Sequence, residues 1–296
     1  MRVFHLYSYL LLQLTSIVCF GHEIQVTDDV GHTVVLPKPA SRIVSLAPDI
    51  CELVFSVGAG NKLVGTVEYS DYPAQAKHIE RIGDANGINL ERIALLKPDL
   101  IIAWQSGNPK DVIEKLKQLG FPVFQIEPRT VDDIANAMRR FAILTATQAL
   151  AEPAIAGFEQ QFHQIKRQYQ GKRKVSVFYE IWNQPLITIN GEHLISQVIS
   201  ICGGDNVFAN MNGLAPTVAI EPVLLANPDV IIAGDNMRGK LTDWNTWSFL
   251  TAVRLQNLFL VNWDYINRHS PRIVKGIKQV CEALEQARIH MTASKQ

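Results

Sequence analysis

The chain has 296 residues, of which 47% are apolar and 19% are charged. This composition is typical of a well-packed globular protein and excludes a largely disordered one. Lysine plus arginine equals aspartate plus glutamate at 28 each, so no global field recruits nucleic acid or an anionic membrane. We therefore expect no nucleic-acid partner, and recognition of any charged partner must depend on the local placement of charges.

The segment from Met1 to Gly21 has the features of a secretory signal peptide. Met1-Arg2 gives a positive start, an apolar stretch follows over residues 3–20, and small residues lie near Gly21. The stretch is too short and too interrupted for a membrane span, which needs about 20 apolar residues. Cleavage after Gly21 predicts export to the periplasm. Lipid anchoring at Cys19 is the alternative, but the tetrad 16–19 lacks the usual leucine and small residue.

Short apolar runs separated by helical segments predict a parallel α/β fold. Residues 42–46 are expected to form a buried strand, residues 50–57 a helix capped by Asp49, and residues 63–67 a second strand. Strands of this kind, buried on both faces, are typical of parallel sheets that are covered by helices.

The most informative feature is an internal repeat. Residues 91–103 (ERIALLKPDLIIA) match residues 221–233 (EPVLLANPDVIIA) position by position. Each copy predicts a short helix opened by a glutamate, a Pro-Asp turn and a buried strand. A second echo pairs residues 58–61 with 203–206. Two similar Rossmann-like lobes, each with a mainly parallel sheet, explain both repeats.

A long helical stretch lies between the two copies. Helical composition runs from Thr130 to about Gln170, and Pro153 is expected to interrupt it because proline lacks a donor and clashes with the preceding turn. A rigid connecting helix predicts limited hinge closure. The predicted division is a signal peptide (1–21), an N-terminal lobe (22–145), a connecting helix (146–170) and a C-terminal lobe (171–296).

No motif in the chain demands catalysis. A Gly-x-Ser-x-Gly sequence is absent, and the glycines do not fit dinucleotide or phosphate-loop spacings. The histidines are dispersed and form no two-histidine helix motif. We therefore expect no catalytic residue, metal site or cofactor. An exported metal-dependent enzyme on the same two lobes is a remote alternative, and it would require clustered histidines and carboxylates.

Aromatic side chains follow several predicted strands. Tyr69, Trp104 and Trp182 all occupy such positions, and ligands of parallel α/β sheets bind outside the carboxyl ends of the strands. Each side chain taken alone is more readily explained by packing than by ligand contact, and their shared position makes a ligand site as well supported as packing.

A charged and aromatic segment follows the strand predicted at 258–261. It contains Trp263, Asp264 and Arg268. An exposed Asp264–Arg268 pair would contribute only about 0–1 kcal/mol, so a ligand with amide or phosphate groups is a stronger reason for these charges.

Two further features have two interpretations each. Glu91 and Glu221 open the repeated helices, where each either compensates the helix dipole or anchors a symmetric partner. Three cysteines remain after cleavage, Cys51, Cys202 and Cys281. In an oxidising compartment they predict one disulfide and one leftover thiol, with three pairings possible.

Several stretches of the sequence resemble, in the right order, the periplasmic cobalamin-binding proteins of ABC importers, the BtuF type. They include residues 69–73 (YSDYP), 89–93 (NLERI), 97–100 (KPDL), 102–104 (IAW), 202–204 (CGG) and 270–273 (SPRI). The match runs from about Arg42 to Leu284. The resemblance implies a monomeric binding protein that captures cobalamin or a related corrinoid between its lobes and delivers it to a permease dimer in the inner membrane.

The resemblance also implies roles for individual residues. Positions that match Tyr69, Trp104, Asp264 and Arg268 lie in the corrinoid cleft of the family, where flat aromatic walls replace the hydration of a conjugated macrocycle. Positions that match Glu91 and Glu221 pair with arginines of the permease. Cys202 and Cys281 match the disulfide of the family, which leaves Cys51 as the free thiol.

Two departures concern the ligand. Ala85 and Ala215 stand where the family has tryptophans, which removes aromatic area, and Trp182 and Trp263 are candidates to replace it. Haem, with Tyr69 as the iron ligand, and ferric siderophores are the alternative cargoes. Anionic siderophores usually call for several inward arginines, and the evident candidates are Arg268, Arg238 and Arg272.

Overall fold

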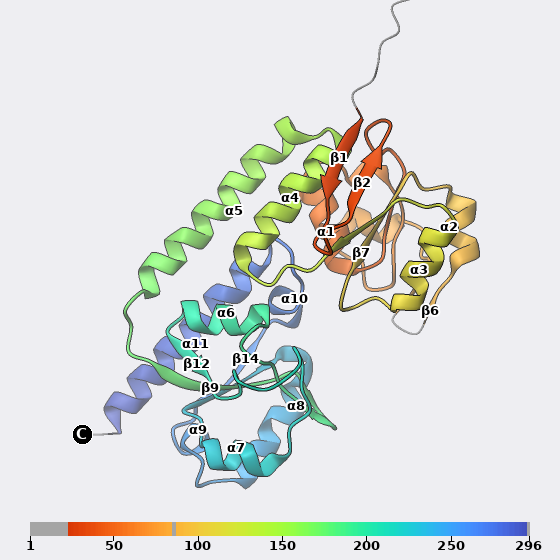
Figure 1. Ribbon diagram of the computed structural model, residues 1–296. Coiled ribbons are helices and arrows are strands. Elements are labelled where there is room, and N and C mark those ends of the chain that lie inside the picture. The colour runs from red at the N-terminus through yellow and green to blue at the C-terminus, as the bar shows by residue number, and fades with distance from the viewer. Residues whose placement is uncertain (1–22, 85–86, 295–296) are drawn as a thin grey trace, which may run out of the picture.

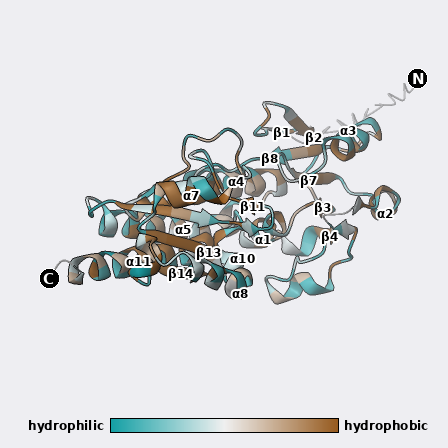
Figure 2. Cartoon of the chain, turned by 90° about the horizontal axis from the view of Figure 1, so that it is seen from below, coloured by the Kyte–Doolittle hydropathy of each residue, from teal (hydrophilic) through white to brown (hydrophobic). Residues whose placement is uncertain are grey.

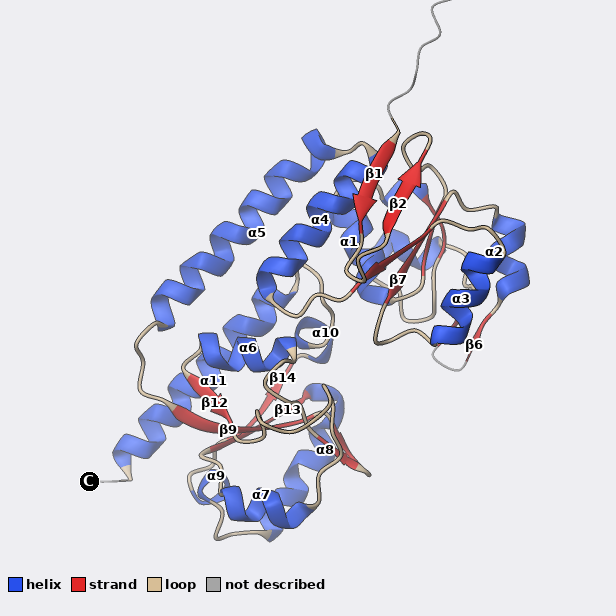
Figure 3. Ribbon diagram, viewed as in Figure 1, coloured by secondary structure: helices blue, strands red, loops and turns tan. Residues whose placement is uncertain are grey.

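Two parallel four-stranded sheets, one in each lobe, organise the protein (Figures 1 and 3). The computed structural model describes residues 23–84 and 87–294. The α/β class and the two-lobed arrangement predicted from the repeat are confirmed. The proposed signal peptide, including Cys19, and Ala85 lie outside the described residues. Within the described ranges, no helix is both long and apolar enough to cross a membrane.

The N-terminal lobe is built on a sheet of order β4-β3-β7-β8. Its strands are β3 (Ile43–Ser45), β4 (Leu63–Gly65), β7 (Leu100–Trp104) and β8 (Val123–Ile126), and all of them are parallel. An antiparallel hairpin of β1 (Ile24–Thr27) and β2 (Thr33–Leu36) precedes them, and β5 (Gly83–Asp84) and β6 (Gly87–Ile88) form a small ribbon. The helices and 3-10 turns are α1 (Pro48–Ser56), α2 (Leu90–Leu96), α3 (Lys110–Gln118), η1 (Gly60–Lys62) and η2 (Ala74–His78).

The C-terminal lobe repeats this plan with a sheet of order β12-β9-β13-β14. Its parallel strands are β9 (Val175–Glu180), β12 (Gly204–Asn206), β13 (Val230–Gly234) and β14 (Leu258–Val261). The short strands β10 (Trp182–Asn183) and β11 (Leu186–Ile187) form a hairpin. The helices and turns are α6 (Leu194–Ile201), α7 (Ile220–Ala226), α8 (Arg238–Leu241), α9 (Thr251–Arg254), α10 (Trp263–Ile266), α11 (Ile273–Ala293), η3 (Asp235–Met237) and η4 (Thr242–Thr246).

Two helices connect the lobes, and the helical stretch is interrupted at a different residue from the one predicted. Helix α4 (Val131–Thr145) begins at a capping box in which Thr130 and Asp133 satisfy each other's backbone N–H groups. It ends at Ala146, whose φ is 52°, and α5 (Gln148–Tyr169) follows. Pro153 lies inside α5, so the prediction that it interrupts the helix is wrong. It is the sixth residue of α5, past the first turn, and the helix continues through it without the hydrogen bond that its missing N–H would donate.

A second correction concerns the start of α1. The sequence indicated Asp49 as the cap, but the helix begins at Pro48 after the extended Ala47. Proline is favoured at this first position because its fixed φ suits the helix and its missing N–H is not needed there. Asp49 therefore lies within the first turn and is buried.

The repeat predicted from sequence corresponds to equivalent elements in the two lobes. Helices α2 and α7 both end at a residue in the left-handed conformation, and each leads through Pro-Asp into a central strand, β7 or β13. Asp99 then accepts hydrogen bonds from Ser41, and Asp229 accepts them from Ser176. The copies therefore share both their backbone path and the bonds that fix it.

One hydrophobic core runs through both lobes. It includes strand residues that face inward from each sheet, such as Ile102 and Ile232, together with side chains of α1, α4, α5, α6 and α11. Alternate residues of the same strands, such as Ile101 and Ile231, belong to two smaller outer cores, one for each lobe. Figure 2 shows the corresponding concentration of hydrophobic residues on strands such as β13.

Candidate ligand-binding site

The carboxyl ends of the two sheets face each other across the junction of the lobes. Residues that follow β3 and β4 in the N-terminal lobe meet residues that follow β14 in the C-terminal lobe. The contacts that establish this are ion pairs of Arg268 with Glu52 and with Asp71, each at 2.9 Å. A cleft between these strand ends is where ligands of parallel α/β proteins bind.

Glu52 is the centre of the contact between the lobes. It lies on α1 with a side chain only 2% exposed. Its carboxylate accepts hydrogen bonds from Arg268 Nη1 at 2.9 Å and from Ser270 Oγ at 2.6 Å. Arg272 donates from Nε at 2.8 Å and also from Nη2. Both carboxylate oxygens are thus satisfied, which offsets the cost of removing the charge from water.

Arg268 is shared among three carboxylates. Besides Glu52 and Asp71, its Nη2 lies 2.9 Å from Asp264 Oδ1. Burial opposes a charged Asp71, but the hydrogen bond and charge of Arg268 dominate and lower the pKa of Asp71. Burial likewise opposes the charge of Arg268, whose pKa is nevertheless raised by its bonds to Glu52 and Asp71. The predicted Asp264–Arg268 pair therefore exists as part of a larger cluster.

Tyr69 and Trp104 line one cavity on the N-terminal side, with a volume of about 220 Å³. Tyr69 is 76% exposed and has a φ of 64°. The turn after β4 thus holds Tyr69 in a left-handed backbone conformation that is unfavourable for tyrosine. The indole of Trp104 lies so close to Gly107 that an added Cβ would come within 1.9 Å of the ring. Two of the predicted ligand contacts therefore share one cavity.

Trp104 also lines a second cavity, of about 220 Å³. Trp104, His193, His269, Arg129, Glu192 and Ala215 are among the residues that line it. Trp104 and His269 pack in a T-shaped arrangement, with ring centroids 5.5 Å apart. Ala215, one of the two departures noted in the sequence, thus faces open volume beside Trp104. Arg129 and Glu192 form an exposed ion pair at 3.1 Å between the lobes.

The two histidines of this cavity are held neutral. Burial lowers the pKa of His193 to about 4, with a smaller contribution from the charge of Arg129. Burial lowers the pKa of His269 to about 3, and His193 contributes to the shift. His193 Nδ1 accepts the backbone N–H of Ile195 at 3.1 Å, whereas His269 Nδ1 has no partner within the described residues.

Trp182 and Trp263 occupy strand ends of the C-terminal lobe. Trp182 begins the β10–β11 hairpin, is 45% exposed, and donates its indole N–H to the carbonyl of Gln184 at 3.0 Å. Trp263 packs over Gly234, and its backbone N–H binds Asp235. Neither is among the residues that line the two cavities beside Trp104. Their contribution to a ligand wall stays a prediction.

Glu91 and Glu221 are both exposed at the second position of α2 and α7. Neither forms an ion pair with any other described residue. They lie on helices at the outside of the two lobes (Figure 1). The structure thus leaves both carboxylates open to solvent or to a partner.

The cysteines adopt the pairing that the resemblance implied. Cys202 and Cys281 form a disulfide that joins the end of α6 to α11. Cys51 is free and buried on α1, and burial raises the pKa of its thiol to about 11. No cluster of three or more metal-ligating side chains occurs in the part of the chain that was described.

Comparisons with known proteins identify the family. A family model for periplasmic binding proteins matches residues 43–265. A vitamin B12-binding protein of Vibrio cholerae is 38% identical over 252 residues, which are 85% of this chain and 91% of the relative. The chain belongs to the periplasmic binding protein family. Its members are binding proteins, so the chain is not an enzyme.

Solved structures agree with this assignment. The crystal structure of the periplasmic vitamin B12 binding protein BtuF of Vibrio cholerae has a TM-score of 0.80 and covers 84% of this chain and 98% of its own. In the comparison of sequences, a second vitamin B12-binding protein, from Yersinia pestis, is 36% identical over 247 residues, which are 83% of this chain and 87% of the relative. The haem-binding protein RhuT from Roseiflexus sp. RS-1 shares the fold, with a TM-score of 0.74 at 21% identity and coverage of 84% and 99%.

The sequence analysis did not identify Glu52, the residue at the centre of the contact between the two lobes of this periplasmic binding protein. Glu52 carried a signal, because it is the one charged residue in a helix segment, Ile50 to Val57, that is otherwise apolar except for Ser56. A charge in such a segment is buried unless the helix turns it outward, and a buried charge requires a partner. The identity of that partner could not be read from the sequence, since Arg272 lies 220 residues away.

We expect Glu52→Gln to destabilise the protein by about 3–5 kcal/mol, because it leaves two arginines without their buried counter-charge. Chemical denaturation of wild type and variant measures the difference. Glu114→Gln is the matched control, since Glu114 is 63% exposed and pairs only with Lys117. The control should change stability by at most about 0.5 kcal/mol. Equal stability of Glu52→Gln and wild type would contradict the assigned role.

Stability should also depend on His269 below neutral pH. The folded pKa is about 3 and the ordinary value is 6.5, so the unfolded chain binds the proton first and stability falls as the pH drops from 6.5 towards 3. In His269→Phe this contribution is absent, and the loss between pH 7.5 and pH 5 should be smaller by on the order of 1–2 kcal/mol. Urea denaturation at both pH values tests this, and parallel losses would contradict it.

Proposed function

We propose that the protein is the solute-binding component of an ABC importer and that it captures cobalamin or a related corrinoid between its lobes. The observation that carries the proposal is the 38% identity, over 85% of the chain, to a protein named for binding vitamin B12. We place the mature protein in the periplasm, after removal of residues 1–21, and expect it to act as a monomer.

The cleft suits a large flat ligand with a polar edge. Tyr69 and Trp104 provide aromatic surface, which favours stacking against a conjugated macrocycle. Ala215 leaves open volume next to Trp104, so the cleft gains space where the family has a bulky ring. We propose that Trp182 and Trp263 supply additional aromatic area from the opposite lobe.

The polar edge of the ligand would meet Asp264 and Arg268. Asp264 is 38% exposed while it pairs with Arg268, so its carboxylate has free acceptor capacity for amide N–H groups. Arg268 is largely occupied by Glu52 and Asp71. A ligand contact with Arg268 would therefore replace its bond to the half-exposed Asp71 more readily than its buried bond to Glu52.

We further propose that Glu91 and Glu221 dock the loaded protein onto an ABC permease dimer of the inner membrane. The two glutamates occupy equivalent positions of the repeat and are exposed and unpaired within the described ranges. One carboxylate on each lobe suits a partner that presents a basic residue twice. This explains why the same acidic position is present in both copies.

Haem is the second candidate cargo, and Tyr69 favours it. An exposed phenol at the mouth of a cavity is sterically able to reach an iron centre. Siderophore binding has less support, because Arg268 and Arg272 already hold Glu52. The side chain of Arg238, the third arginine considered, lies outside the described residues.

Calorimetric titration of the mature protein with cyanocobalamin, cobinamide and haemin tests the cargo. We expect binding of both corrinoids and no response to haemin. Trp104→Ala should weaken corrinoid binding by about tenfold or more, because it removes the indole that lines both cavities of the cleft. Trp247→Ala, at a half-buried tryptophan of the C-terminal lobe, is the control and should bind as wild type. Binding of haemin alone would reject the proposal.

Docking is tested with the ABC permease complex of the same genome, reconstituted in lipid nanodiscs. Glu91→Gln and Glu221→Gln should each raise the dissociation constant about tenfold, because each removes one charge pair from the interface. Glu152→Gln, an exposed glutamate of α5, should bind normally. Corrinoid affinity should stay unchanged in all three variants. A permease that binds the double variant as tightly as wild type would refute docking through these residues.

A further inference from the structure

Two leucines at equivalent positions of the lobes are exposed far more than their residue type favours. Leu95 on α2 is 76% exposed and Leu225 on α7 is 86% exposed. Their separation in the sequence equals the one that relates Glu91 to Glu221. Scattered surface leucines need no explanation, but a duplicated pair at one register of a repeat does.

The repeat fixes where each leucine points. In α2 the one buried residue is Ile93, and in α7 it is the equivalent Val223. Leu95 lies one helical turn after Glu91, and Leu225 lies one turn after Glu221, so each leucine shares a helix face with its glutamate. Each lobe therefore presents the same small patch, a carboxylate with an apolar side chain one turn away.

The structure offers no intramolecular use for these side chains. Folding does not require a leucine at a position that stays three-quarters exposed, and helix propensity alone would be satisfied by a charged or small residue. Both helices lie on the outside of their lobes (Figure 1). An apolar side chain exposed to solvent and flanked by an unpaired charge matches an interface contact with a polar rim.

We infer that Leu95 and Leu225 are apolar anchors of the docking surface, each filling a hydrophobic pocket next to a basic residue on one subunit of a two-fold symmetric permease. The inference rests on the proposed function, which assigns docking to Glu91 and Glu221. The inference adds that the permease contacts both an acidic and an apolar side chain on each lobe. A two-fold symmetric permease presents the same surface twice, and this chain presents the same glutamate–leucine patch twice, once on each lobe.

The two elements have different roles in binding. The glutamates attract the permease over a distance set by ionic strength, so their effect weakens as salt is added. The leucines act only at contact, through surface removed from water, and this contribution is nearly independent of salt. The complex should therefore keep a salt-resistant part of its affinity that depends on Leu95 and Leu225.

The test measures binding of the full mature protein to the ABC permease complex of the same genome in lipid nanodiscs, at low and high salt. Leu95→Ala and Leu225→Ala should each raise the dissociation constant about tenfold, and the double variant about a hundredfold, since the patches are far apart and independent. The leucine effects should persist at high salt, whereas those of Glu91→Gln and Glu221→Gln should shrink.

Leu150→Ala is the matched control, because Leu150 is 68% exposed on α5 and outside the repeat; it should bind within about twofold of wild type. Cyanocobalamin affinity should be unchanged in every leucine variant. Normal permease binding by the double leucine variant, or an effect of only one leucine, would overturn the inference while leaving docking by the glutamates intact. A wild-type protein that binds neither cyanocobalamin nor the permease would instead reject the proposed function.

Discussion

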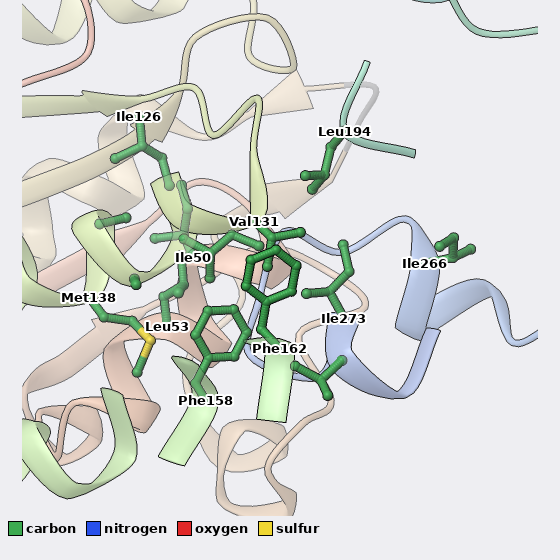
Figure 4. Packing of buried hydrophobic residues seen from close by; sticks show 14 of the residues in the cluster. Ile50, Leu53, Ile126, Val131, Met138, Phe158, Phe162, Leu194, Ile266 and Ile273 are labelled. Carbon is green, nitrogen blue, oxygen red and sulfur yellow. The ribbon is translucent and has the colours of Figure 1, made fainter. Parts of the chain in front are cut away.

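A single apolar core that crosses the junction of the lobes is the constraint on which the rest of the structure depends. Figure 4 shows Ile50 and Phe162 packed near Ile273, so side chains from α1 and α5 share one cluster with the start of α11. Opening the lobes here would expose this surface to water at a cost of about 25 cal/mol for each Å². The cleft is therefore held close to one geometry, and its residues can be positioned before any ligand arrives.

The polar cluster around Glu52 depends on that core and reinforces it. A carboxylate with 2% exposure survives only because Arg268, Arg272 and Ser270 surround it. Such a cluster adds less to stability than its bonds suggest, since desolvation offsets them, but it fixes the relative position of the groups it joins. Arg268 also pairs with Asp71 and Asp264, which are 50% and 38% exposed. The same residue thus links the buried junction to carboxylates at its exposed edge.

The sequence predicted the parts of this fold that depend on local patterns and on repetition. Buried strands, the helix start at Thr130 and the two-lobed plan follow from periodicity, cap chemistry and duplication. The break in the connecting helix was misplaced to Pro153, because tertiary packing of a helix can outweigh the local cost of a proline and the left-handed Ala146 carries no recognisable signal. The role of Glu52 was missed because its partners come from another lobe. Contacts between residues so distant in the sequence are set by packing, which local patterns do not encode.

Among the described residues, the ion pairs around Glu52 and the Arg129–Glu192 pair both join the lobes, but they differ in strength. The two sides of the cleft therefore resist separation unequally. Glu52 is buried with its partners, whereas Arg129 and Glu192 are 45% and 74% exposed. An exposed pair contributes about 0–1 kcal/mol and is screened by salt, so separation on the Arg129 side costs much less than separation on the Glu52 side. Trp104 and the cavity beside Ala215 lie next to the weak side. Small movements of the lobes therefore cost the least free energy on the side of the cleft where Trp104 and Ala215 line open volume.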